Sequence, residues 1–152
     1  MKLLIVEKNT NKGEIIGMDA ILIRNDHENV IEFVDFANKN NVHVYFWIVE
    51  YKSKNVDLNE VNCVFINKEV ASLIENGMMD EQILMEDILK RYANLRIVLL
   101  SQDKGYYYKD KDFFVYQKSL GKEICEEDFI KKFLEYEMKG YTEMTSLYKA
   151  CA

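Results

Sequence analysis

The stretch DAILIRNDHENVIEFVDFANKNNVHVYFWIV (residues 19–49) decides the fold of this chain. Its two ends, DAILIRND (19–26) and VHVYFWIV (42–49), are apolar runs of the length of a β-strand. Between them, four apolar residues recur at helical spacing: Val30, Ile31, Val34 and Ala37. Asp26 is placed to cap this helix and Asn40–Asn41 to end it. Strand, helix and strand in this order predict a βαβ unit with a right-handed crossover between parallel strands.

Further strand-like and helical patterns alternate along the rest of the chain. The strand-like runs are KLLIVE (2–7), VNCVFIN (61–67), LRIVLLS (95–101) and FFVYQKS (113–119), and the helical patterns cover 68–77, 80–92 and 126–139. The segment QDKGYYYKDKD (102–112) is charged and lacks apolar periodicity, so we expect a loop there. This alternation predicts an α/β fold, a three-layer αβα sandwich with a mainly parallel sheet of five or six strands.

Length and composition limit the class of protein. A chain of 152 residues predicts one domain, here 1–140, followed by a tail (141–152) that is either a docked helix or the start of a linker helix. The net charge of −6 argues against a nucleic-acid partner. Three cysteines without a C-x-x-C pair suggest neither a zinc nor a redox site. The apolar run at the N-terminus is too short for a signal or a membrane span, so we expect a cytoplasmic protein.

The predicted strands end in polar residues at the edge of the sheet where α/β proteins bind ligands. The candidate residues are Asn25, Asp26, Asn67, Ser101 and Lys118. Because the carboxyl ends of parallel strands meet at one edge, we expect these side chains to line one crevice. They supply one acid, one hydroxyl, one lysine and two amides.

The order of these residues resembles the pocket of the receiver domain of bacterial two-component response regulators, which has a flavodoxin-like fold. The resemblance covers residues 19–139. It places Asn25 and Asp26 at the acidic pair that holds Mg²⁺ in that family, and Asn67 at the phosphoacceptor aspartate. It places Ser101 at the phosphate-sensing hydroxyl and Lys118 at the phosphate-contacting lysine.

Departures from the receiver pattern predict a degenerate receiver. Asn67 carries an amide, which cannot attack a phosphoryl group at neutral pH. Ser119 stands where the family has proline, and the segment between the last two predicted strands is too short for a full helix. The resemblance therefore implies a pseudo-receiver in signal transduction that is not phosphorylated on aspartate and needs neither metal nor cofactor.

The first functional hypothesis is a non-catalytic regulatory or protein-interaction domain. Its expected partner is a protein, a C-terminal output domain such as a ParA/MinD-like ATPase, or a second copy of the chain. The chain has ten Tyr, eight Phe and one Trp, and Tyr and Trp favour interfaces. The expected interaction surface includes Tyr106, Tyr107 and Tyr108.

The alternative hypothesis is a small α/β enzyme, or a nucleotide- or anion-binding protein, that uses the same strand-end crevice. An enzyme there needs two acids or an activated nucleophile. A third, more remote hypothesis comes from KLLIVEK (2–8), which resembles the opening strand of the Toprim domain, in which Glu7 would act in metal-dependent nucleic-acid chemistry. That family also needs an Asp-x-Asp after a later strand, and the only such pair, Asp110-x-Asp112, precedes its strand.

Overall fold

The computed structural model describes residues 1–51, 56–74, 80–102, 104–120 and 125–152. These residues form one seven-stranded sheet in which the strands follow the order of the chain. The strands are β1 (Leu3–Ile5), β2 (Ala20–Arg24), β3 (His43–Ile48), β4 (Cys63–Asn67), β5 (Ile97–Gln102), β6 (Gly105–Lys109) and β7 (Phe114–Lys118). Strands β1 to β5 are parallel, β6 is antiparallel to its neighbours, and the sheet has more strands than the five or six expected.

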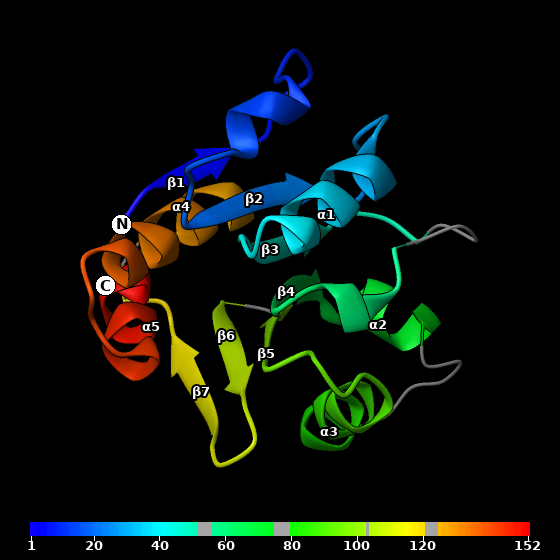
Figure 1. Cartoon of the computed structure of the whole chain (residues 1–152). Helices are drawn as coiled ribbons and strands as arrows, with labels where there is room; N and C mark the ends of the chain where they lie inside the picture. Colours follow the sequence, from blue (N-terminus) through cyan, green and yellow to red (C-terminus); the bar gives the residue numbers. More distant parts are fainter. Residues whose placement is uncertain (52–55, 75–79, 103, 121–124) are drawn as a thin grey trace.

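Helices cover both faces of the sheet, as Figure 1 shows. The α-helices are α1 (Val30–Lys39), α2 (Lys68–Ile74), α3 (Glu81–Arg91), α4 (Glu126–Met138) and α5 (Glu143–Cys151), with short 3-10 helices η1 (Lys12–Ile15) and η2 (Leu58–Glu60). Right-handed crossovers between strands that advance in one direction place α1, α2 and α3 on the same face. Helices α4 and α5 pack on the other face. None of the helices described is long and apolar enough to cross a membrane.

The order of the strands corrects the expected flavodoxin-like arrangement. In that arrangement the order is 2-1-3-4-5, so the direction of travel reverses once and leaves a crevice at the switch point. The sheet of this chain runs from β1 to β7 without a reversal. The α/β fold is confirmed, whereas the receiver-like topology is wrong.

The alternating side chains of the parallel strands are buried under different helices on the two faces of the sheet. In β3, Phe46 and Ile48 face the first group of helices, whereas Tyr45 and Trp47 face the second. Burial on both faces explains why the strands are nearly continuous apolar runs rather than alternating patterns. The stripe predicted for α4 is confirmed, because Phe129, Ile130, Phe133 and Leu134 are all buried.

The segment expected to be a loop at 102–112 contains strand β6 instead. Tyr106 and Tyr108 point into the core beneath α4, and Tyr107 stacks on Phe114 on the opposite face. The segment looked aperiodic because tyrosines occupy both faces of the strand, although tyrosine favours strands. Gly105 begins β6 because a Cβ there would collide with the Tyr116 hydroxyl and lie 2.6 Å from the carbonyl oxygen of Gln117.

Three further details differ from the sequence-based expectations or add to them. In α1, Val30, Val34 and Ala37 are buried as predicted, whereas Ile31 is exposed and Phe33 is buried instead. The end predicted for the helix at 68–77 lies outside the described residues. The tail forms α5, which buries Leu147 and Ala150.

Candidate functional site

The predicted site residues all lie at the carboxyl edge of the parallel strands but do not form one pocket. Asn67 pairs with Ser101 across β4 and β5, and Lys118 pairs with Gly105 across β7 and β6. Asp26 follows β2, which is five strands away from β7 in the sheet. Since neighbouring strands lie about 4.8 Å apart, this separation is about 24 Å. Without a reversal in strand order, no crevice gathers these ends.

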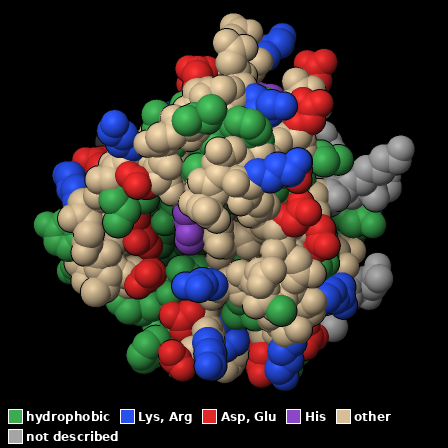
Figure 2. Space-filling view, viewed as in Figure 1, with side chains coloured by type: hydrophobic (Ala, Val, Ile, Leu, Met, Phe, Trp, Pro, Cys, Tyr) green, Lys and Arg blue, Asp and Glu red, His purple; other side chains and the backbone are tan. Residues whose placement is uncertain are grey.

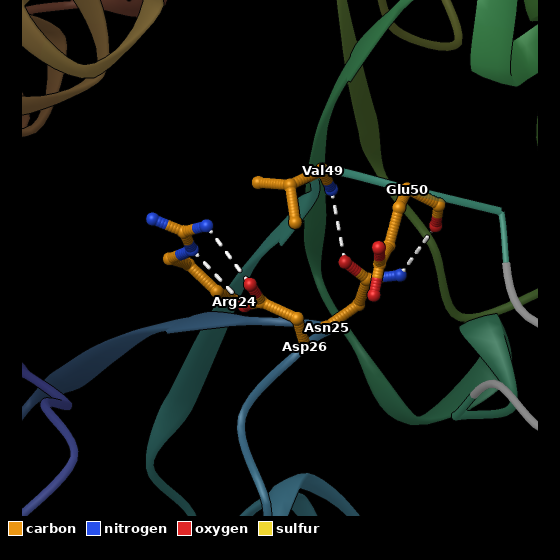
Figure 3. A network of polar contacts seen from close by, with 5 residues as sticks. All are labelled: Arg24, Asn25, Asp26, Val49 and Glu50. Atoms are coloured by element: carbon orange, nitrogen blue, oxygen red, sulfur yellow. Dashed lines mark hydrogen bonds and ion pairs between the residues drawn. The ribbon is translucent and has the colours of Figure 1, made fainter.

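Asn25 joins the ends of β2 and β3, as Figure 3 shows. Its Nδ2 donates to the carbonyl oxygen of Glu50 at 2.7 Å, and its Oδ1 accepts from the amide of Val49 at 2.9 Å. The side chain is buried and extends the hydrogen bonding of the sheet by one residue. In the receiver resemblance this position holds a metal, whereas here the amide holds two strand ends together.

Asp26 binds Arg24 rather than capping α1. Arg24 Nε donates to Asp26 Oδ1 at 3.0 Å, and Nη2 donates to Oδ2 at 2.9 Å, so the pair is bidentate (Figure 3). The guanidinium carbon also lies 4.9 Å from the centre of the Trp47 ring. A bidentate carboxylate and an aromatic face fix the plane of an arginine, which leaves its remaining N–H groups oriented for a ligand.

The other predicted residues have structural contacts. Asn67 Oδ1 accepts from the amide of Val70 at 2.8 Å and thereby caps the first turn of α2. Lys118 is exposed at the end of β7, and Ser101 is half-buried in β5. The tyrosines proposed as a surface lie within β6, with Tyr106 stacked at 3.5 Å on Phe129 and Tyr108 donating to Asp110 Oδ2 at 2.7 Å.

A cavity of about 450 Å³ lies at the carboxyl ends of β1, β2 and β3, against the first two turns of α4. Its walls combine acidic, basic and apolar side chains. The lining residues are Ile5, Val6, Glu7, Lys8, Leu22, Arg24, Asp26, His27, Glu28, Trp47, Glu127, Ile130 and Lys131. This edge is where open α/β sheets bind their ligands. The cavity is therefore the candidate site, and Asp26 is the one predicted residue that lines it.

His27 connects β1 to the start of α1. Its Nδ1 accepts from the amide of Asn29 at 3.0 Å, so its Nε2 carries the proton and donates to the carbonyl oxygen of Glu7 at 3.1 Å. The amide of Glu7 donates to Thr10 Oγ1 at 2.8 Å. These bonds hold the backbone of Glu7, which lines the cavity.

Helix α4 supplies the charged groups of the opposite wall. Lys131 pairs with Glu127 at 3.1 Å on the exposed side of the helix. Burial raises the pKa of the neighbouring Glu126, and the Trp47 indole and Arg24 partly offset this effect. From this helix, Glu127, Ile130 and Lys131 line the cavity, and Glu126 lies beside it.

The polar residues at the ends of the predicted strands identify only Asp26 among the residues that line the cavity. The sequence points to Glu7 only through the Toprim resemblance, because the receiver resemblance begins at residue 19. Glu127 and Lys131 lie on a helix that follows the last strand, and no sequence spacing relates them to β2. The alternation of strands could have pointed to Glu7, since β1 is the first of five parallel strands.

The metal-dependent Toprim hypothesis is wrong for this chain. Asp110 lies in the turn between β6 and β7, where its Oδ1 accepts from the amides of Asp112 at 2.8 Å and Phe113 at 2.7 Å. That turn is at the amino edge of the parallel strands, across the sheet from Glu7. Among the residues that the structure describes, no group of three His, Cys, Asp or Glu side chains is close enough to hold a metal ion.

Comparison with known proteins identifies the fold. No protein-family model matches the chain, and no curated protein matches it in sequence. Solved structures do match. Ribokinase from Thermotoga maritima gives a TM-score of 0.77 at 12% identity and covers 94% of this chain and 51% of its own. Adenosine kinase from Sinorhizobium meliloti gives 0.74 at 11% identity, with 94% and 50% covered. Phosphofructokinase-2 from Escherichia coli, solved with fructose-6-phosphate, gives 0.72 at 9% identity, with 92% and 52% covered.

These similarities show a ribokinase-like fold and overturn the receiver resemblance. These three structures are kinases and not receiver domains, so the hypothesis of a non-catalytic pseudo-receiver in signal transduction is wrong. The comparison favours the alternative of an enzyme over the expectation of a non-catalytic chain. The receiver resemblance rests on two features of the sequence, alternating strands and helices and polar residues after the strands, and neither feature fixes the order of the strands in the sheet. The chain spans about half the length of these three kinases.

Proposed function

We propose that this chain binds a small phosphorylated molecule in the cavity beyond β1–β3 and takes part in phosphoryl transfer to or from it. The observation that supports this most is the position of the cavity at the carboxyl edge of a fold shared with kinases. These kinases are named for a sugar, a nucleoside and a sugar phosphate. Phosphoryl transfer depends mainly on positioning and on charges that stabilise phosphate oxygens.

The cavity contains groups suited to each part of this task. Arg24 is oriented by Asp26 and Trp47, and Lys8 and Lys131 stand on two other walls. These cations would bind phosphate oxygens. In the described part of the chain, the Glu7 carboxylate makes no ion pair. It would accept a hydroxyl proton or a sugar hydroxyl.

A coupled assay for ADP tests this proposal. The folded chain is incubated with ATP, Mg²⁺ and ribose, adenosine or fructose-6-phosphate in turn. We expect acceptor-dependent ADP release, lowered at least tenfold in Glu7→Gln. Glu135→Gln is the matched control, because Glu135 is an exposed carboxylate on α4 outside the cavity.

Release of ADP that no acceptor changes, or equal rates in both variants, would contradict the proposal. A chain that releases no ADP but binds the phosphorylated compounds would retain the binding function and lose the catalytic one. The two parts of the proposal are thereby tested separately.

A further inference from the structure

Strand β1 is an outer strand of the sheet, and one side of it is open. The amide of Val6 donates to Leu22 at 2.9 Å, and the carbonyl oxygen of Lys2 accepts from Ala20 at 3.2 Å. In a parallel ladder alternate residues bond to the same side, so Leu3 and Ile5 turn their backbone groups away from β2. Within the described ranges, no donor or acceptor meets these outward groups.

The strand at this edge is itself apolar, and Ile5 is 38% exposed. Acidic and basic side chains are mixed over the face shown in Figure 2. The four residues from Leu3 to Val6, in contrast, include no charge and no proline. An uncharged outer strand with free backbone groups is a template for pairing with another strand.

The other outer strand, β7, is protected. Helix α5 packs against it. The amide of Leu120, just after β7, donates to the carbonyl oxygen of Cys151 at 2.7 Å. Lys118 and Tyr116 also place a charge and a bulky exposed ring on this strand. The two edges of the sheet are therefore unequal, and β1 is the one suited to extension.

We propose that β1 pairs with β1 of a second copy of this chain, in antiparallel orientation. Residues that exchange both backbone bonds lie directly opposite each other in such a pair. Leu3 would therefore face Ile5 of the second copy, and Leu4 would face itself on the two-fold axis. Each of these facing pairs is apolar, so the edge is complementary to itself, as a two-fold interface requires.

Association would also extend the candidate site. Ile5, Val6, Glu7 and Lys8 form the outer wall of the cavity, and the second copy would continue the sheet beyond that wall. This consequence rests on the proposed function. The association itself does not, because it is measured without any ligand.

Light scattering during size-exclusion chromatography tests the pairing. The wild-type chain is expected at twice its mass of 18.0 kDa. Ile5→Pro removes an outward N–H, and Ile5→Lys places two like charges at the interface, so each is expected to raise the dimer dissociation constant at least tenfold. Ile31→Lys is the matched control, since Ile31 is 59% exposed on α1 and lies away from this edge.

Circular dichroism shows whether each variant folds, and Ile5→Lys decides the matter if Ile5→Pro does not fold. A monomeric wild-type chain would overturn the proposal. So would a dimer that both folded Ile5 variants retain, or one that is lost in Tyr116→Lys instead, because that result would place the interface on β7.

Discussion

The two faces of the sheet are built from the same strands but differ in their residue composition, and the candidate cavity lies on only one of them. On the face beneath α1, α2 and α3, 2 of the 25 buried hydrophobic residues described are aromatic. Beneath α4 and α5 the proportion is 7 of 16. Helices α1, α2 and α3 cover the aliphatic face, whereas α4 and α5 cover the aromatic face. The candidate cavity lies between the aromatic face and α4.

The candidate cavity lies on the face that is richer in polar and aromatic side chains. Aliphatic side chains fill the space between a sheet and its covering helices at high packing density and bury no polar side-chain group. The aromatic face carries polar handles, because tyrosine and tryptophan combine a large apolar area with one hydrogen-bonding group. The half-buried carboxyls with raised pKa values, Glu126 and Glu137, also lie on this side.

The largest expected effect comes from truncating the centre of the aromatic face. Phe133 is fully buried, 5.8 Å from the ring of Phe65 and 6.0 Å from that of Phe129. Phe133→Ala should lower the free energy of unfolding by about 3–5 kcal/mol. Ile66→Val, a smaller deletion on the aliphatic face, should cost about 0.5–1.5 kcal/mol. Urea denaturation measures both, and a loss below about 1 kcal/mol for Phe133→Ala would show that the ring is not packed in the core.

A smaller effect is expected at the hairpin that extends the aromatic face. Gly105→Ala would push a methyl group against the Tyr116 hydroxyl and the Gln117 carbonyl. We expect a loss of about 1–3 kcal/mol in unfolding free energy, the range for forcing a group into a packed site. Gly13→Ala is the control, because no atom lies within 4 Å of the added carbon. A neutral Gly105→Ala would show that β6 and β7 can move apart.

The smallest of these effects is a dependence of stability on pH. Burial, together with the nearby Glu143, raises the pKa of Glu137 from 4.5 to about 7. The folded chain then binds this proton more tightly than the unfolded chain, so stability is highest below about pH 4.5 and falls as the pH rises to about 7. After solvent screening, the loss is on the order of 1 kcal/mol.

Glu137→Gln tests this dependence. As the pH rises from 4.5 to about 7, the range between the two pKa values, the denaturation midpoint should fall less in this variant than in the wild type. Glu135→Gln serves as the control, since Glu135 is exposed on the same helix and pairs with Lys139 at 3.2 Å. A wild-type profile that rises with pH would contradict the assigned direction.

Local pattern predicted the elements well, because helical spacing and strand-length apolar runs record which residues are buried. The stripe of α4 and the βαβ unit at 19–49 are examples. Pattern could not predict the order of strands, since sequential and flavodoxin-like sheets use the same elements. The site depended on that order. Without the strand order, the sequence could not show that Glu7 and Glu127 lie in the same cavity as Arg24. It also could not show that Lys118 lies five strands away from Asp26.

Fluorescence of the single tryptophan tests the central claim most directly, because Trp47 lines the candidate cavity. Titration with fructose-6-phosphate or ADP should give a saturable change in emission. Arg24→Gln should weaken the binding at least tenfold, and Lys39→Gln, which changes a cation outside the cavity, should leave it unaltered. An emission that neither compound changes, or a dissociation constant that is the same in Arg24→Gln and the wild type, would contradict a phosphate-binding site at this edge of the sheet.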